Sequence, residues 1–285
     1  MLPLRLARCS GCVQARRANV RIMTTEHVLD DQPLVPVRRM ANKVPEVTVY
    51  FWIIKVLTTG MGETASDLLA RLLGPVPAVA LGGIALTVAL AVQFALRQYV
   101  AWAYWTAVVM VSVFGTMAAD VLHVGLGVPY AVSAPAFLGV LAAVFVLWYA
   151  SERTLSIHSI RTRRRETFYW AAVLATFALG TAAGDLTASI GFGYLGSVAL
   201  FAAAICEPAL THRFGSLNAV PAFWIAYVIT RPLGASLADW MALGHARGGL
   251  GLGLAPVTLA WTAAIVGFVG YLAVSQRNTH AHHTA

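Results

Sequence analysis

Charged side chains are scarce in this 285-residue chain. Asp, Glu, Lys and Arg make up 11% of it, whereas hydrophobic residues make up 59% and the mean hydropathy is +0.72. In a soluble domain about a quarter of the residues are charged, so this chain lacks the residues to cover a water-facing surface. The composition therefore excludes an ordinary soluble protein and indicates that lipid is the main solvent.

Cysteine is also rare, and the motifs of several chemistries are missing. Cys9 and Cys12 form a C-x-x-C, but the second pair that a zinc site needs is absent. The chain has no G-x-x-x-x-G-K-[ST] phosphate-binding motif, which argues against ATP-driven pumping within it. We expect no cofactor. We also expect no nucleic-acid partner, because the basic residues behind the pI of about 9.8 cluster on one side of a membrane.

Long apolar runs recur along the whole chain and predict an all-α integral membrane protein. A helix needs roughly 20 apolar residues to cross a bilayer, and these runs are too long for barrel strands of about 10 residues. The sixth run is the weakest, since it is short and ends at Cys206, Glu207 and Pro208. We expect about eight transmembrane helices, at residues 46–70, 76–96, 101–122, 129–150, 167–189, 191–208, 219–241 and 252–274.

Basic residues gather on one side of the predicted spans. Sixteen of the 20 Lys and Arg residues lie on the side that holds both ends of the chain. Arg71 and Arg247 lie on the other side, and Lys55 and Arg231 lie within spans. Because Lys and Arg near span ends concentrate in the cytoplasm, we expect both termini to be cytoplasmic.

One sequence motif occurs four times. Each copy reads as an aromatic residue, Trp, nine residues, Gly, four residues and Asp, as in YWTAVVMVSVFGTMAAD at 104–120. Four matches at identical spacing, each in the same place of a two-helix unit, indicate fourfold internal duplication. The motif residues are Trp52, Trp105, Trp170 and Trp224, then Gly62, Gly115, Gly180 and Gly234, then Asp67, Asp120, Asp185 and Asp239.

Helical geometry gives each motif residue an expected role. Trp, Gly and Asp fall on one side of the helix. Trp near the cytoplasmic end suits an interfacial anchor, and Gly allows close contact between helices. Asp in the outer half of a span should face protein or water. Every unit holds two spans, so the four units are parallel. Their aspartates approach one another if the motif faces point inward.

The duplication also divides the chain into segments. We expect a disordered basic tail at 1–41, repeats at 42–98, 99–158, 159–214 and 215–275, and a C-terminal tail at 276–285. The first tail has some likeness to a transit peptide. Alternatively, the true start is Met23 or Met40 in place of Met1.

The first repeat, NKVPEVTVYFWIIKVLTTGMGETASDLL at 42–69, carries a resemblance to a known family. The chain is similar to bacterial multi-span proteins that are described as membrane-anchored and are built from a repeat of unknown function. The resemblance covers residues 41 to 275. It implies a multi-pass protein of the bacterial cytoplasmic (inner) membrane, with the lipid bilayer as a partner, and it implies no activity.

Differences among the copies point to candidate functional residues. The first copy alone adds Lys55 and Glu63, and the fourth alone has Arg231 before its Gly. A charge inside a membrane costs at least about 2.5–3.5 kcal/mol, so it is functional by default. Alternatively, Lys55 and Arg231 form buried ion pairs with carboxylates that only tie the helices together. We expect an interior ion-binding site of Glu63, Asp67, Asp120, Asp185 and Asp239, with Lys55 and Arg231 as counter-charges.

Three further features bear on ion binding. Pro232 should kink or break the seventh span. Thr58, Thr176 and Thr230, each six residues after a Trp, either line an ion path or bond to their own helix. His123 lies one turn beyond Asp120, and such a pair suits a transition metal such as manganese or zinc.

The sequence favours a secondary transporter or channel for a cation, coupled to H⁺ or a metal ion, with a small ion or solute as its partner. Lys55 and Arg231 also admit an anionic or zwitterionic solute with proton coupling. A non-transporting scaffold, in which each Asp ties its repeat to the next, is the alternative. An enzyme is disfavoured, because intramembrane aspartyl proteases carry G-x-G-D and residues 182–185 read Ala-Ala-Gly-Asp. The oligomeric state stays open.

Overall fold

The structure, a computed structural model, describes residues 42–282, and helices joined by short loops make up this part of the chain. The expected tail at 1–41 lies outside the described residues, as do the C-x-x-C and the alternative starts Met23 and Met40. Of the expected C-terminal tail at 276–285, residues 276–282 belong to the last helix and 283–285 lie outside the described residues. The α-helices are α1 (Val49–Leu73), α2 (Pro75–Ala95), α3 (Ala101–Asp120), α4 (Tyr130–Glu152), α5 (Arg163–Thr187), α6 (Gly193–Arg213), α7 (Ala219–Ala242) and α8 (Leu254–His282). Each corresponds to one predicted span, with different ends.

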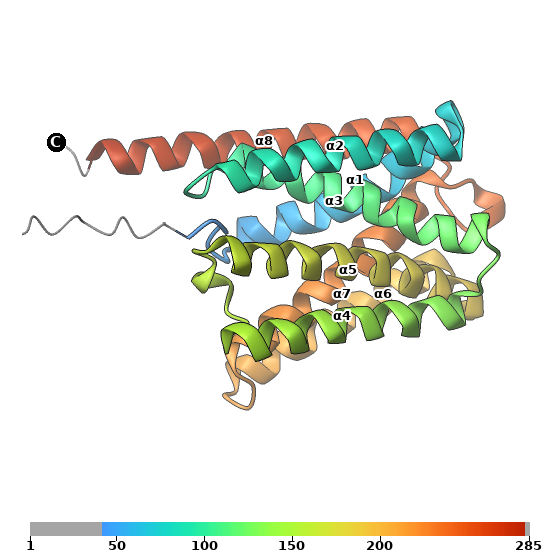
Figure 1. The fold of residues 1–285 in the computed structure, drawn as a ribbon. Helices are drawn as coiled ribbons and strands as arrows, with labels where there is room; N and C mark the ends of the chain where they lie inside the picture. The colour runs from blue at the N-terminus through green and yellow to red at the C-terminus, as the bar shows by residue number, and fades with distance from the viewer. Residues whose placement is uncertain (1–41, 283–285) are drawn as a thin grey trace, which may run out of the picture. The chain divides into compact units, whose positions relative to one another are not determined.

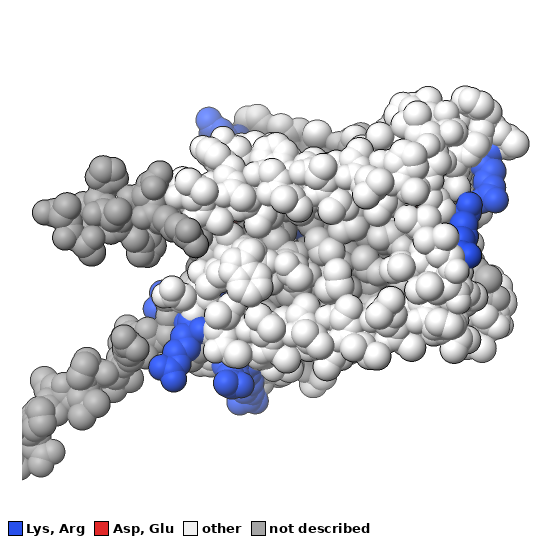
Figure 2. All heavy atoms as spheres, turned by 90° about the horizontal axis from the view of Figure 1, so that it is seen from above, with Lys and Arg blue, Asp and Glu red and all other residues white. Residues whose placement is uncertain are grey.

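Apolar helices dominate the described part of the chain, as expected for an all-α membrane protein. Five segments there are long and apolar enough to cross a membrane: Pro75–Ala95, Ala101–His123, Tyr130–Glu152, Arg163–Arg213, which contains both α5 and α6, and Leu254–Ser275. Helices α1 and α7, which carry Lys55, Glu63 and Arg231, are not among them. Eight crossings therefore remain a prediction. On one face, Lys and Arg gather at the two ends and the band between is nearly uncharged (Figure 2).

The sixth helix is longer than the sequence indicated. Helix α6 continues through Pro208 to Arg213, so Glu207 and Pro208 do not end it. Proline is tolerated inside membrane helices because neighbouring helices and local adjustments satisfy the freed carbonyl. Between α5 and α6 the chain makes a π-helical turn at Ala188–Phe192, in which Gly191 has φ of 111°. Glycine reaches this conformation without the strain that a Cβ causes.

The four motif helices form a closed ring. Helix α1 packs on α3, α3 on α5, α5 on α7, and α7 returns to α1. The second helix of each repeat packs on the motif helix of the next repeat, so α2 covers α3, α4 covers α5, α6 covers α7 and α8 covers α1 (Figure 1). We call the line enclosed by α1, α3, α5 and α7 the axis.

The aromatic pair of each motif joins neighbouring repeats at one end of the ring. In every copy, the aromatic residue before Trp contacts the Trp of the next copy, and the fourth copy contacts the first. Because all four contacts involve the amino-terminal ends of the motif helices, these helices run in parallel. The ring-centroid distances are 5.6 Å for Phe51–Trp105, 5.6 Å for Tyr104–Trp170, 6.1 Å for Tyr169–Trp224 and 5.7 Å for Phe223–Trp52.

These contacts correct the expected role of the tryptophans. Trp105, Trp170 and Trp224 are at most 4% exposed, and Trp52 is half-buried. Trp224 Nε1 donates to the Leu155 carbonyl at 2.9 Å, within the protein. The interfacial-anchor prediction is therefore wrong for the three buried rings. Their large apolar surface is buried between repeats, where aromatic pairs also gain from their ring geometry.

Candidate functional site

The motif glycines lie where neighbouring motif helices touch. A Cβ added to any of them would collide with a side chain of the next motif helix around the ring. The side chain that this Cβ would meet belongs in each case to the seventh residue after the Trp of the neighbouring copy. The aromatic pairs and glycines thus act in helix packing, and the aspartates remain to be explained. The pairs are Gly62 with Ser112, Gly115 with Phe177, Gly180 with Arg231, and Gly234 with Thr59.

Arg231 occupies the centre of the ring. It is fully buried and extends from α7 past Gly180. Its Nη2 donates to Glu63 Oε2 of α1 at 2.7 Å and to Thr181 Oγ1 of α5 at 2.7 Å. The same nitrogen donates to the Thr116 hydroxyl of α3. One guanidinium therefore links all four motif helices at one depth.

The partners of Arg231 share one position in the repeat. Glu63, Thr116 and Thr181 are each the eleventh residue after the motif Trp, and the fourth copy has Ala235 there. Sequence analysis singled out Glu63 and missed the two threonines. Aligning the copies position by position would have found them, because three polar residues at one position of an apolar helix indicate a shared polar layer.

Lys55 lies against the ring of Phe177, which Arg231 also approaches. Its Nζ is 4.1 Å from the centroid of the Phe177 ring and 4.2 Å from that of the Tyr227 ring. The Phe177 ring also lies 5.3 Å from Arg231 Cζ. Lys55 is fully buried, and Nζ has no hydrogen-bond acceptor. The buried-tie interpretation thus applies to Arg231 and Glu63, and Lys55 has no carboxylate partner.

The motif aspartates lie four residues beyond the level of Glu63 on each motif helix. Asp239 is buried, and Asp67, Asp120 and Asp185 are half-buried. Because the motif helices are parallel and pack in one ring, the four aspartates lie at the same end of the axis, about one helical turn beyond Glu63, and each of them feels the charge of Glu63. Within residues 42–282, none of the four is ion-paired, and the ion pair of Arg231 is with Glu63.

His123 has a local structural role. Its Nδ1 lies 2.8 Å from the Val128 carbonyl, its Nε2 lies 3.1 Å from Ser133 Oγ, and its ring lies tilted against Tyr130 at 3.8 Å between centroids. Both ring nitrogens therefore have partners, one in the loop before α4 and one in the first turn of α4. Over the described part of the chain, no three His, Cys, Asp or Glu side chains are placed to hold a metal ion. The manganese or zinc interpretation gains no support.

The expected break in the seventh span does not occur. Helix α7 runs from Ala219 to Ala242 through Pro232, which packs near Gly180 in the crowded centre of the ring. The three threonines bond to their own helices, each hydroxyl donating to the carbonyl three residues earlier. The distances are 2.8 Å for Thr58, 2.6 Å for Thr176 and 2.6 Å for Thr230.

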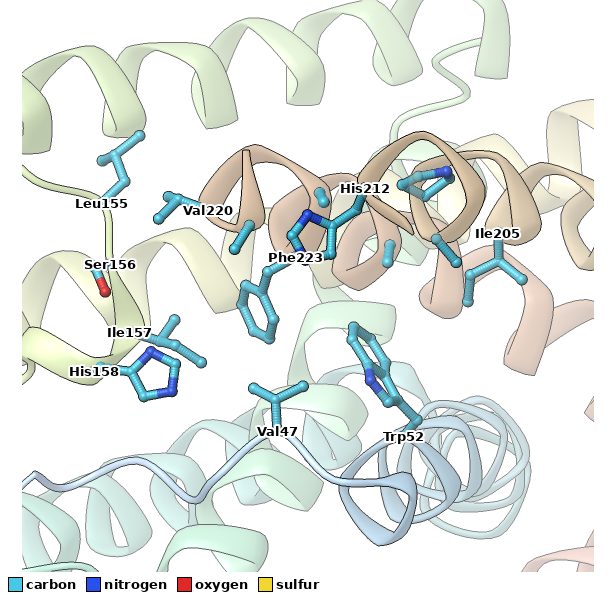
Figure 3. A pocket seen from close by; sticks show the side chains of 15 residues that line it. Val47, Trp52, Leu155, Ser156, Ile157, His158, Ile205, His212, Val220 and Phe223 are labelled. Carbon is cyan, nitrogen blue, oxygen red and sulfur yellow. The ribbon is translucent and has the colours of Figure 1, made fainter. Parts of the chain in front are cut away.

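Figure 3 shows the residues that line a cavity of about 520 Å³. The end of α6, the start of α7, Trp52 of α1 and the loop that includes Leu155 enclose it. Its lining is mostly apolar, with His158 and His212 among the few polar side chains. None of the motif aspartates lines it. We therefore place the candidate site on the axis and not in this cavity.

Comparison with known families identifies the repeat. The model of the family described as Repeat of Unknown Function (DUF347) matches at residues 50–99, 103–154, 168–212 and 222–278, which together make up more than half of the chain. The chain belongs to this family. Each DUF347 match begins two residues before a motif Trp and contains one Trp–Gly–Asp copy, which confirms the fourfold repeat. No curated protein and no solved structure was found to match the chain.

Proposed function

We propose that this DUF347 protein moves a cation across the bacterial inner membrane as a secondary transporter or channel. One observation carries the proposal: four aspartates gather near Glu63 and have no ion-pair partner within the described residues. Helix packing accounts for the aromatic pairs and the glycines, but it does not account for these carboxylates. A carboxylate inside a membrane is costly, so carboxylates without an ion pair are expected to meet a mobile positive charge.

The geometry suggests how a cation is admitted. The aspartates form an acidic end of the axis, which attracts cations. The Arg231–Glu63 pair closes the axis behind them. A cation bound among the aspartates competes with Arg231 for Glu63, and release of the guanidinium opens the path. On this proposal the partners are the lipid bilayer and a small ion, and the protein is not an enzyme.

Ion flux into proteoliposomes tests the proposal. We expect the parent protein to move at least one ion of a panel of Na⁺, K⁺, Mg²⁺ and Mn²⁺, followed with ion-sensitive dyes. Asp67→Asn and Asp239→Asn should abolish that flux while thermal stability stays near the parent value, because Asn keeps the shape and removes the charge. Glu207→Gln, which changes an exposed carboxyl on α6, is the matched control and should keep full flux.

A scaffold is the second candidate, and the links that Arg231 makes to all four motif helices favour it. On that interpretation the interior charges act only in holding the repeats together. A correctly folded parent that moves no ion of the panel, together with aspartate variants that fail to fold, would support the scaffold and reject transport.

A further inference from the structure

The two buried lysines of the described residues have opposite surroundings. Lys43 Nζ lies 2.6 Å from Glu166 Oε2 and 3.2 Å from the Phe94 carbonyl, so its charge is balanced and hydrogen-bonded. Lys55 Nζ has no acceptor. A buried charge is normally paired, since removing it from water is otherwise too costly. Lys55 is the exception.

Aromatic faces take the place of an acceptor around Lys55. The rings of Phe177 and Tyr227 lie on the ammonium at 4.1 and 4.2 Å, and the negative face of each ring attracts a cation. These rings carry no net charge. The ring faces therefore attract the ammonium, but no fixed negative charge holds the positive charge there.

The groups around this space are few and can be named. Tyr227 and Arg231 reach it from α7, and Arg231 repels the Lys55 charge. Beyond Tyr227, Tyr104 of α3 and Tyr169 of α5 bring their hydroxyls to 2.5 Å from each other. Tyr227 interacts electrostatically with this pair. Among the described residues no carboxylate pairs with Lys55, so a second cation meets only repulsion here while the ammonium stays charged.

We infer that Lys55 makes cation movement an exchange for a proton. This inference rests on the proposed function. A monovalent cation takes the place of the ammonium charge. Lys55 releases one proton and its nitrogen keeps the electron pair as a neutral amine, which binds the cation beside the faces of the two rings. When the cation leaves, a proton returns to the amine. One proton moves for each cation, so no net charge crosses the membrane.

Proteoliposomes loaded with a pH dye test the exchange. An imposed Na⁺ or K⁺ gradient should drive proton movement in the opposite direction through the parent protein without creating a membrane potential. Lys55→Met removes the proton site, so the cation should still move, but it should create a membrane potential and carry no proton. Lys55→Arg keeps a permanent positive charge, because arginine does not deprotonate in proteins, and it should block both movements.

The third copy provides a matched control. Val173 occupies the position of Lys55 in that copy and is also fully buried, so Val173→Met should keep the parent exchange. The inference is overturned if Lys55→Met or Lys55→Arg exchanges like the parent. It is also overturned if Lys55→Met moves neither the cation nor protons although its thermal transition shows that it is folded. A parent that moves cations without protons overturns the exchange and leaves the proposed function standing, whereas a parent that moves no cation overturns the proposed function itself.

Discussion

At the scale of single residues, Glu63 and Arg231 are separated by 168 positions in the chain and form a buried ion pair of 2.7 Å. Breaking such a pair by removing one partner leaves an uncompensated charge and costs about 3–5 kcal/mol. We therefore expect Glu63→Gln to lower stability by about that amount. The double variant Glu63→Gln with Arg231→Met should recover a large part of the loss, because no buried charge is left. Unfolding in detergent, followed for both single variants and the double variant, gives the coupling energy.

Asp67 provides the contrast to Glu63. It is half-buried and has no ion pair among the described residues, so Asp67→Asn should change the free energy of unfolding by less than about 1 kcal/mol. If Glu63→Gln were as stable as Asp67→Asn, the ion pair would not hold the ring together.

The candidate site could be predicted in part at this scale. The repeat identified all seven of the proposed site residues, because charges stand out in apolar helices. It did not reveal that Arg231 pairs with Glu63 while Lys55 lies between aromatic rings. A helical wheel gives the direction of a side chain and not the neighbour it meets. The tryptophans were misplaced for the same reason, since an indole suits a membrane interface and a packed interior equally well.

At the scale of helices, the contact between α7 and α1 depends on Gly234. A Cβ at this position would meet the side chain of Thr59 and lie 2.9 Å from the Val56 carbonyl. Gly234→Leu should therefore overpack the contact and cost about 1–3 kcal/mol, with a lower yield of folded protein. Gly139 of α4 is the control, because a Cβ there has no atom within 4 Å and Gly139→Leu should be tolerated. A stable Gly234→Leu would contradict the close packing of the ring.

The segment before α1 is attached to the far side of the ring. The Lys43 backbone N–H donates to the Ile160 carbonyl at 3.1 Å, and the Lys43 side chain pairs with Glu166 of α5. Lys43→Met should leave the buried Glu166 carboxylate without its ion-pair partner and lower the free energy of unfolding by about 3–5 kcal/mol. Hydrogen exchange at residues 42–47 should become faster. Adding Glu166→Gln should reverse most of the stability loss. Unchanged exchange in Lys43→Met would show that the backbone contacts alone hold this segment.

Helix ends were the part of the fold that the sequence predicted least well. Pro208 with Glu207 suggested the end of the sixth span, yet α6 continues to Arg213. Pro232 suggested a break, yet α7 is continuous. In both cases tertiary packing overrides a local helix signal. The helix pairs themselves were predictable, because a span of about 20 apolar residues followed by a short turn leaves few alternatives.

At the scale of the whole molecule, the distribution of basic residues predicts the orientation in the membrane. Reporter fusions after Arg97, within 158–165 and at Ala285 should report the cytoplasm, and a fusion near Gly127 should report the outside, because Lys and Arg favour the cytoplasmic side. A periplasmic signal from 158–165 would contradict the eight-span topology.

The packing of α8 on α1 has a consequence for synthesis. Thr258 of α8 donates to the Thr64 hydroxyl of α1 at 2.8 Å, and the Tyr271 and Tyr50 rings lie tilted with 5.5 Å between their centroids, so the last helix covers the first. The ribosome makes α1 first, and both α8 and the Arg231 partner of Glu63 follow much later. Helix α1, which carries the buried Lys55 and Glu63, must therefore stay in the membrane without these contacts until nearly the whole chain has been translated. A nascent chain that stops before residue 254 leaves α1 uncovered, and we expect membrane proteases to remove such chains much faster than the full-length protein in pulse-chase experiments.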